Sequence, residues 1–496
     1  CFIGNTLPDR MQHDGWLETL IQSRFPKSKL AFRDLGFSGD EVGGYTAKPE
    51  FNQRLRSASF GSGDEWLTRT KADVIFAFFG YNESFAGKEG LEAFKKELDD
   101  CIKHTLAQKY NGKSAPRLVL FSPIAHENLH DRNLPDGVEN NKRLALYAEA
   151  MAEVAAADKI PFVDLFKPSQ DLYAKAAKPL TINGIHLTEE GDREIAEVID
   201  RELFPNDAAP KRDAQALEKL RQAVLDKDFM WFNRYRTLDG YSIYGGRADL
   251  KFAPDQQTNR EVAQREMEVL DVMTANRDKR IWAVAQGGDL KVDDADTPPF
   301  ILVKTNIPGK GPNGEHVFLS GEDEIKTMTL GKNLKINLFA DEKMFPELAK
   351  PVQMSWDTKG RLWVAVWPSY PHWKPTEEQN DKILILEDTD GDGKADKCTV
   401  FADHLHCPTG FEFYNGGILV AQAPDIMFLK ASDGGDHADI RVRVLDGMDS
   451  ADTHHTSNSF AIDPGGAVYW QEGTFHHTQV ETPYGPTLHN VNAGVY

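Results

Sequence analysis

Phe2-Ile3-Gly4-Asn5-Thr6-Leu7 is an apolar strand that breaks into a small, polar turn, the form of a nucleophile turn. Three later segments break in the same way, from an apolar run into a Gly/Asn turn: Leu30 to Gly39, Val74 to Asn82, and Asn183 to His186. In an open α/β sheet the carboxyl ends of the parallel strands line one crevice, so we expect the four segments to meet there. A hydroxyl, two oxyanion donors and a histidine would then share one site.

Residues 1 to 205 alternate short β-rich runs with amphipathic helical runs. The expected strands are Cys1 to Gly4, Leu30 to Leu35, Val74 to Phe79, Arg117 to Phe121 and Pro161 to Leu165. The expected helices are Trp16 to Ser23, Leu91 to Tyr110, Asn141 to Ala156 and Thr188 to Leu203. This alternation predicts an α/β domain, a mostly parallel sheet covered by helices.

Two further regions follow in the chain. Residues 206 to 330 predict a helical bridge, with helices at Asp213 to Leu225 and Glu261 to Asn276. An aromatic run between them, Phe229 to Tyr235, is expected to pack against a neighbouring domain. From residue 331 to 496, short strands with glycine turns repeat at Asp357 to Ala365, Tyr414 to Ala421 and Asp463 to Trp470. That repetition predicts an all-β propeller, incomplete in this sequence.

The net charge of the chain indicates which kinds of binding partner are unfavourable. The chain has 496 residues, with 77 acidic against 57 basic side chains and a net charge of −20. This charge argues against nucleic acid or an anionic membrane surface as the main partner, and solubility is the plainer explanation of it. No run of about eighteen apolar residues occurs, so we expect no transmembrane helix. Because the chain begins at Cys1, inside a predicted strand, we expect a fragment from which any signal peptide has been lost.

Residues 1 to 205 resemble the GDSL or SGNH hydrolase family, esterases and lipases on a flavodoxin-like sheet. Gly4-Asn5-Thr6-Leu7 stands where that family has Gly-Asp-Ser-Leu, and Ser38-Gly39-Asp40 looks like its second block. Gly80-Tyr81-Asn82 looks like the third block, and Asn183-Gly184-Ile185-His186 takes the place of the Asp-x-x-His block. The resemblance implies an ester hydrolase with Thr6 as nucleophile, His186 as base, Asn183 orienting the imidazole, and Gly39 and Asn82 in the oxyanion hole.

Two departures from the family pattern leave a second reading open. Thr6 replaces serine, and its methyl group restricts its rotamers, although threonine also serves as a nucleophile. Asn183 replaces aspartate, so it is expected to accept a hydrogen bond from His186 without supplying charge. In the serine proteases the same exchange costs about 10⁴-fold in rate. The alternative is a non-catalytic glycan-binding scaffold that holds acyl or acetyl groups without cleaving them.

A calcium-loop pattern lies in the third region. Asp388, Asp390, Asp392 and Asp396 occupy the first, third, fifth and ninth places, with Gly393 sixth and Lys394 seventh. Oxygen ligands at alternate positions let a short chain wrap a hard cation, and the glycine permits the sharp turn. The twelfth place is threonine rather than a bidentate glutamate, which lowers the expected affinity. The alternative is a solvated acidic turn.

The segment from Asp452 to Gly473 resembles soluble quinoprotein glucose and sorbosone dehydrogenases, over some twenty residues. In that match His455 falls on the general-base histidine, which implies pyrroloquinoline quinone as cofactor and a sugar as substrate. The order of parts also resembles large secreted proteins of planctomycete-type bacteria described as membrane-bound dehydrogenases. Together the resemblances imply an exported carbohydrate-processing protein, an ester hydrolase acting on a glycan and fused to a sugar-dehydrogenase-like propeller.

Overall fold

The N-terminal part of the molecule is built on a parallel sheet. The computed structural model describes residues 1–46, 60–206, 213–251, 257–303, 309–474 and 476–496. The sheet has the order β1-β2-β3-β4, formed by β1 (Phe2–Gly4), β2 (Val74–Phe78), β3 (Arg117–Phe121) and β4 (Phe162–Val163). The segment 33–37 runs along the free edge of β1 through backbone hydrogen bonds to Phe2 and Gly4. This order is the flavodoxin-like one, so the predicted α/β fold is confirmed.

The prediction of a strand at Leu30 to Leu35 is wrong in detail, because this segment forms only an isolated parallel bridge between Phe2 and Asp34. The reason lies on its outer side. The carbonyl of Asp34 accepts a hydrogen bond from Trp231 Nε1 at 2.6 Å, and the carbonyl of Leu35 accepts one from the Tyr235 hydroxyl at 3.0 Å. Side chains of a later helix therefore satisfy these edge carbonyls.

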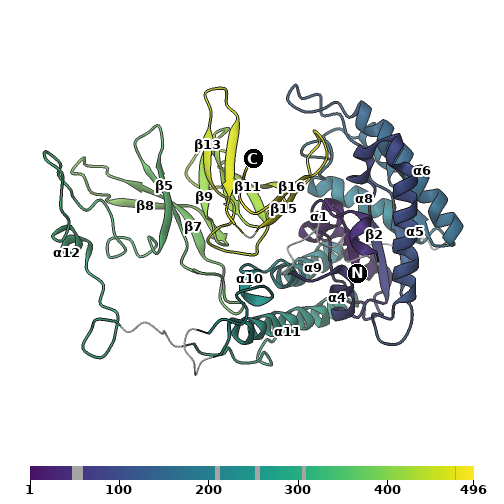
Figure 1. Ribbon diagram of the computed structural model, residues 1–496, viewed down its shortest axis with the longest axis horizontal. Helices are drawn as coiled ribbons and strands as arrows, with labels where there is room; N and C mark the ends of the chain where they lie inside the picture. Colours follow the sequence, from purple (N-terminus) through teal and green to yellow (C-terminus); the bar gives the residue numbers. More distant parts are fainter. Residues whose placement is uncertain (47–59, 207–212, 252–256, 304–308, 475) are drawn as a thin grey trace.

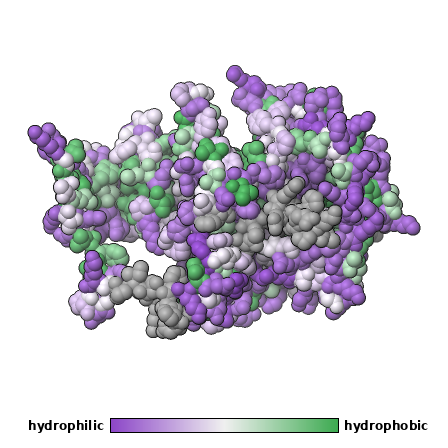
Figure 2. All heavy atoms as spheres, viewed as in Figure 1, coloured by the Kyte–Doolittle hydropathy of each residue, from purple (hydrophilic) through white to green (hydrophobic). Residues whose placement is uncertain are grey.

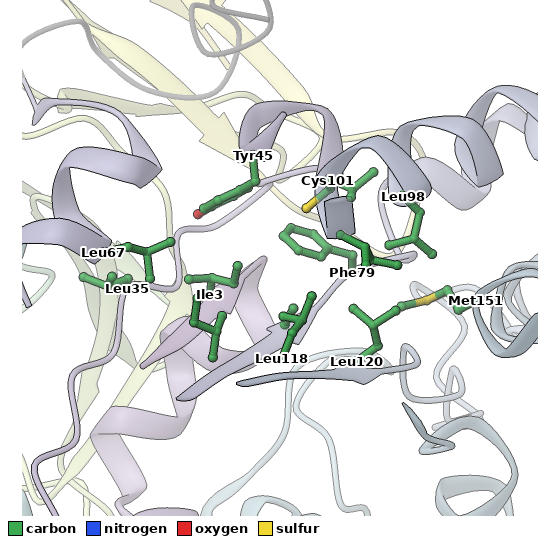
Figure 3. Close-up of a cluster of buried hydrophobic side chains, with 14 of the residues drawn as sticks. Ile3, Leu35, Tyr45, Leu67, Phe79, Leu98, Cys101, Leu118, Leu120 and Met151 are labelled. Atoms are coloured by element: carbon green, nitrogen blue, oxygen red, sulfur yellow. The ribbon is translucent and has the colours of Figure 1, made fainter. Parts of the chain in front are cut away.

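Helices cover both faces of the sheet (Figure 1), and β3 shows how its alternating side chains serve the two faces. Leu118 and Leu120 join the core shown in Figure 3, to which α4 (Gly63–Arg69), α5 (Leu91–Ala107) and α6 (Val138–Asp158) contribute. Val119 and Phe121 point into the second core, with α1 (Thr6–Asp14), α2 (Trp16–Arg24) and α8 (Glu189–Leu203). A shorter helix, α7 (Phe166–Tyr173), follows β4.

Of the helices after residue 213, the two long ones pack on this domain (Figure 1). The helices of this part of the chain are α9 (Ala214–Tyr235), α10 (Gly240–Ile243), α11 (Asn259–Ala285) and, farther along, the short α12 (Gly321–Ile325). The aromatic run was expected between two helices, but it forms the last turns of α9, because it continues the helical pattern without a breaker. The packing predicted for it is confirmed: Tyr235 meets Trp66 edge to face, with ring centroids 4.8 Å apart.

The C-terminal region consists of antiparallel sheets. The first contains β5 (Pro351–Trp356), β6 (Leu362–Val366), β7 (Asp381–Glu387) and β8 (Lys397–Leu405), and the second β9 (Gly410–Tyr414), β10 (Gly417–Gln422), β11 (Asp425–Lys430) and β12 (Ile440–Leu445). A three-stranded sheet joins β13 (Asn458–Ile462), β14 (Val468–Glu472) and β17 (Gly494–Val495), and a two-stranded one joins β15 (His477–Val480) and β16 (Leu488–Val491). The three predicted glycine turns connect β5 to β6, β9 to β10 and β13 to β14. The sheets of the described residues close no ring, so the mostly-β character is confirmed whereas a propeller is not shown (Figure 1).

The surface differs between the two parts. In the space-filling view, hydrophobic residues are more frequent over the C-terminal sheets, at the left, than over the N-terminal domain (Figure 2). Val352, Met354 and Trp356 of β5 are among the exposed apolar side chains. Within the described ranges, no helix combines the length and apolar character needed to cross a membrane.

Candidate active site

The turn after β1 places Thr6 at the start of α1. Gly4 has φ +131°, and a Cβ atom there would lie 2.0 Å from the carbonyl oxygen of Phe78, so only glycine fits at this crossing. Asn5 caps the helix, its side-chain oxygen accepting the Leu7 N–H at 3.1 Å. Thr6 is fully buried, and its hydroxyl donates to Ser38 Oγ at 2.9 Å. The predicted nucleophile therefore lies under the second block.

Polar contacts hold the second and third blocks together. Gly39 has φ +77°, in the left-handed region that favours glycine. The Glu83 carboxylate accepts the Val42 N–H and the Gly80 N–H, both at 2.9 Å, and so ties the loop after Gly39 to the one after β2. Burial raises the pKa of Glu83 to about 8, and nearby Glu41 adds to the effect. Asn82 lies in the same enclosed space, and its Nδ2 donates to the Asp40 carbonyl at 3.4 Å.

Asn183 does orient His186, but in the opposite sense from the expected one. Its Oδ1 already accepts the N–H groups of Ile185 at 3.2 Å and of His186 at 3.0 Å. Its Nδ2 lies 3.1 Å from His186 Nδ1. Because an amide nitrogen only donates, Nδ1 is the acceptor, and a neutral imidazole in this contact carries its proton on Nε2. The expectation that Asn183 accepts from His186 is therefore wrong in the observed arrangement.

The C-terminal region adds three residues to this site. Glu481 Oε1 lies 3.6 Å from His186 Nε2, and Glu481 Oε2 accepts from Asn82 Nδ2 at 3.0 Å. The Thr487 hydroxyl donates to Asn82 Oδ1, and Gln479 Nε2 donates to the Ser38 carbonyl at 3.0 Å. Sequence reasoning missed all three, because no motif surrounds them and some 400 residues separate them from their partners. Asn82 and His186 thus meet across a carboxylate from the other end of the chain.

Little space is left among these groups. A cavity of about 20 Å³ lies beside the turn, lined by residues that include Asn5, Leu7, Tyr81, Ile185 and Glu481. A second cavity, of about 10 Å³, lies beside His186 and Arg10. The larger one has room for about one water molecule. An acyl group does not fit while the C-terminal residues occupy the site.

The predicted calcium loop joins β7 to β8. Ligand oxygens of Asp388, Asp390 and Asp392 lie within 4.8 Å of one another. Asp396 is turned to Thr389 instead, where it accepts from the hydroxyl at 2.7 Å and from the N–H at 3.2 Å. The Lys394 ammonium lies 3.7 Å from Glu322, and because it is a cation, only the backbone carbonyl of Lys394 can serve as a ligand. Three of the five predicted metal residues are thus brought together by their side chains.

His455 lies apart from the four blocks, in the loop before β13. Its Nδ1 is 3.1 Å from Asp452 Oδ2, and its side chain is half exposed. Burial alone would raise the pKa of Asp452, but the His454 N–H, His455 and Arg247 outweigh it and lower that pKa to about 2. Pyrroloquinoline quinone carries carboxylates, which a cationic side chain would have to bind. The cation beside His455 is Arg247, and it is already paired with Asp452 and Asp239. These residues do not fit the quinone.

Comparisons with known proteins agree with the N-terminal fold. A family model described as the GDSL-like Lipase/Acylhydrolase family matches residues 10–194, and one described as a Domain of unknown function (DUF7133) matches residues 320–494. The first match begins after Thr6, and the description of the second names neither a propeller nor a dehydrogenase. No curated protein matches the chain.

Several solved structures are similar to the N-terminal part. A catalytic mutant of an acetylxylan esterase from Geobacillus stearothermophilus is 15% identical, with 41% of this chain and 92% of that chain covered and a TM-score of 0.30. The native aryl esterase of M. smegmatis is 15% identical, covering 41% and 98%, with a TM-score of 0.29. A gut microbial diltiazem-metabolizing enzyme is 20% identical, covering 40% and 45%, with a TM-score of 0.31. By its family match and its sheet order, the segment 10–194 is a GDSL-like lipase/acylhydrolase domain.

Proposed function

We propose that the N-terminal domain is a carboxylic ester hydrolase that removes an acyl group, such as acetyl, from a glycan. The observation that carries the proposal is the meeting of the four blocks at the carboxyl end of the sheet. Asn82 and His186 contact the two oxygens of one carboxylate, Glu481, so a carbonyl-sized group fits between a donor and an imidazole. The family match to residues 10–194 supports the same reaction class.

The reaction assigns one role to each group. The Thr6 oxygen forms a bond to the acyl carbon as its proton passes to His186, and the Gly39 N–H and the Asn82 amide hold the resulting oxyanion. Each such donor typically lowers the barrier by about 3 to 4 kcal/mol. Collapse of the intermediate breaks the ester bond, the alcohol leaves with the proton from His186, and water releases the acid in a second, equivalent step. His186 must first carry its proton on Nδ1, which requires Asn183 to present oxygen, so we expect slow turnover.

The test is hydrolysis of an aryl acetate by the full chain. Because Glu481 and Thr487 cover Asn82, the assay includes the double variant Glu481→Ala/Thr487→Ala. In that background Thr6→Ala and His186→Ala should each abolish hydrolysis, whereas His104→Ala, a histidine in α5 that bonds to Asp64, should not change it. Hydrolysis that never exceeds the rate in buffer would contradict the proposal.

A non-catalytic glycan-binding scaffold is the second candidate, favoured by the Asn183 N–H that points at His186 Nδ1. It predicts heat of binding to an acetylated oligosaccharide in calorimetry, with no acetate released. The assay above separates the two candidates, because only the hydrolase consumes the ester.

Export, which the family resemblance implies, and calcium binding, which the spacing of the aspartates predicts, complete the proposal. A Ca²⁺ ion would be held by Asp388, Asp390 and Asp392, whose oxygens lie close enough to share one cation. Export and the glycan substrate rest on the likeness to secreted carbohydrate-processing proteins. Sugar oxidation with His455 as base is not included in the proposed function, because the surrounding residues do not fit the quinone.

A further inference from the structure

The loop between β15 and β16, residues 481–487, lies beside the N-terminal domain (Figure 1), and its two end residues contact Asn82 of the site. Its backbone is held at the rim by side chains of that domain. The Tyr81 hydroxyl donates to the Thr482 carbonyl at 2.8 Å, and Asn140 Nδ2 donates to the Pro483 carbonyl at 3.1 Å. At the rim the loop donates in return from the Tyr484 hydroxyl to the Asn133 carbonyl at 2.8 Å. The contact thus involves three segments of the rim.

Inside the rim, the two ends of the loop enter the site itself. Glu481, only 5% exposed, places one carboxylate oxygen on the Asn82 amide and the other near His186 Nε2. The Thr487 hydroxyl takes the remaining atom of the Asn82 amide, its Oδ1, and the Thr487 methyl group lies against Gly39. The carboxylate therefore occupies the position where the oxyanion of an ester would be held.

We propose that residues 481–487 are an autoinhibitory strap, which fills the acyl site and must withdraw before an ester can reach Thr6. The inference rests on the proposed hydrolase function of this same site. With the strap in place, the cavity beside the turn has room for about one water molecule. The C-terminal region thereby regulates the N-terminal domain.

The contacts that hold the strap in place are weak enough to be broken without unfolding the N-terminal domain. The strap joins two strands that pair only with each other among the described residues. β15 itself is buried in the C-terminal region, where the Gln479 N–H donates to the Gly447 carbonyl at 2.9 Å, so release is a movement of the loop and not of β15. The grip of the strap consists of hydrogen bonds, each of modest net value, and it includes a buried carboxylate whose desolvation opposes closure. Tyr484, at its tip, is two-thirds exposed. Withdrawal therefore requires no disruption of either core of the N-terminal domain.

The first measurement is the accessibility of His186. The full chain and the double variant Glu481→Ala/Thr487→Ala are treated with diethyl pyrocarbonate, and carbethoxylation of His186 is followed by peptide mass spectrometry. Each substitution removes a hydrogen bond that favours the closed state, so the modification rate should rise about tenfold. Glu342→Ala, an exposed carboxylate of the same region, is the matched control and should leave the rate unchanged. Equal rates in the native chain and the double variant would overturn the strap.

Aryl acetate hydrolysis by the same samples separates this inference from the proposed function. A rise in both His186 modification and hydrolysis supports both. A rise in modification without hydrolysis leaves the strap as a cover and overturns the esterase. If the double variant fails to fold, as judged by circular dichroism, Tyr484→Ala takes its place, because its exposed side chain contributes one bond to the grip and nothing to a core. It should raise the modification rate in the same direction, and an unchanged rate would again overturn the strap.

Discussion

The two histidines expected to act as bases, His186 and His455, each supply half of what base catalysis needs. His455 has a carboxylate on Nδ1, 3.1 Å away on Asp452, which is the partner that leaves Nε2 to take a proton, but its side chain is half exposed. His186 has an amide NH₂ at the same distance from Nδ1, but it is buried and shares the Glu481 carboxylate with the Asn82 donor group. A histidine therefore indicates base chemistry only where the correct Nδ1 partner and an enclosed site coincide.

The largest expected effect comes from giving His186 the partner that His455 has. In Asn183→Asp, one oxygen keeps the Ile185 and His186 N–H groups, and the other accepts a proton from Nδ1, which leaves Nε2 free to act as base. Since the reverse exchange costs a serine protease about 10⁴-fold, hydrolysis by the double variant should rise about 10³-fold or more in kcat. Aryl acetate kinetics measure it. A rate that does not rise would show that the Nδ1 partner does not limit this site.

Removing the donor that accompanies His186 gives the next largest effect. Asn82→Ala in the double variant should lower kcat about 10²-fold, because one oxyanion donor is lost while Thr6 and His186 remain. The double variant is needed because Asn82 also holds Glu481 and Thr487. A rise in KM alone, with kcat unchanged, would place Asn82 in binding rather than in catalysis.

The sequence predicts the N-terminal fold well because its signals are local. Gly4 can be recognised because it directly follows an apolar strand. The structure requires glycine there, since the carbonyl of Phe78 lies too close to β1 to leave room for a side chain. The edge segment Leu30 to Leu35 fails as a strand because Trp231 and Tyr235, some two hundred residues later, bond to its carbonyls. Local pattern does not contain that information.

The same limit applies to the site and to the C-terminal sheets. Thr6, Gly39, Asn82 and His186 carry motif signals, whereas Glu481 lies in an ordinary polar loop whose importance depends on how the two regions pack. Glycine turns predict hairpins such as the one joining β5 to β6, but not the closure of sheets into a ring. The direction of the hydrogen bond from Asn183 also depends on two backbone N–H groups that no sequence pattern reveals.

The buried acid near His455 predicts a pH dependence of stability that is separate from catalysis. Burial raises the pKa of Glu472 from 4.5 to about 7, against hydrogen bonds from Thr478 and Tyr496. Between those values the folded state holds a proton that the unfolded state has released, so its contribution to stability is full below about pH 4.5 and is lost as pH rises through about 7.

Comparison of Glu472→Gln with the native chain isolates this contribution. Burial lowers the pKa of His476 to about 4, which acts in the opposite direction below pH 6.5, so the native chain alone is not informative. The native chain should gain up to about 1.4 kcal/mol per pH unit relative to Glu472→Gln as pH falls from 7 to 5, measured by urea unfolding. A constant difference between the two would contradict the raised pKa.

Calcium at the loop between β7 and β8 is expected to give a smaller effect. A bound ion stabilises the folded state by mass action, so a chelator should lower Tm by about 2–4 °C. Asp388→Asn should abolish that response, since both Asp388 oxygens face the loop. If chelator does not change the melting temperature of the native chain, the loop is the alternative, a solvated acidic turn without calcium. Ester hydrolysis by the double variant should be the same with and without chelator, because this loop contributes no residue to the four blocks.

The smallest effect is expected at His455. His455→Ala removes the contact with Asp452, but that carboxylate keeps Arg247 and the His454 N–H, so no buried charge is left unpaired. Because the His455 side chain is half exposed, its contact with Asp452 is worth about 0–1 kcal/mol, and the loss in urea unfolding should stay within that range. Hydrolysis of aryl acetate by the double variant should be unchanged, in contrast with His186→Ala. If both substitutions abolished hydrolysis equally, the two histidines would serve one site. Burial of the histidine would then not explain why one acts as a base and the other does not. If only His186 matters, the C-terminal region contributes to the reaction through the strap, and the carboxylate on His455 orients an imidazole that the ester does not use.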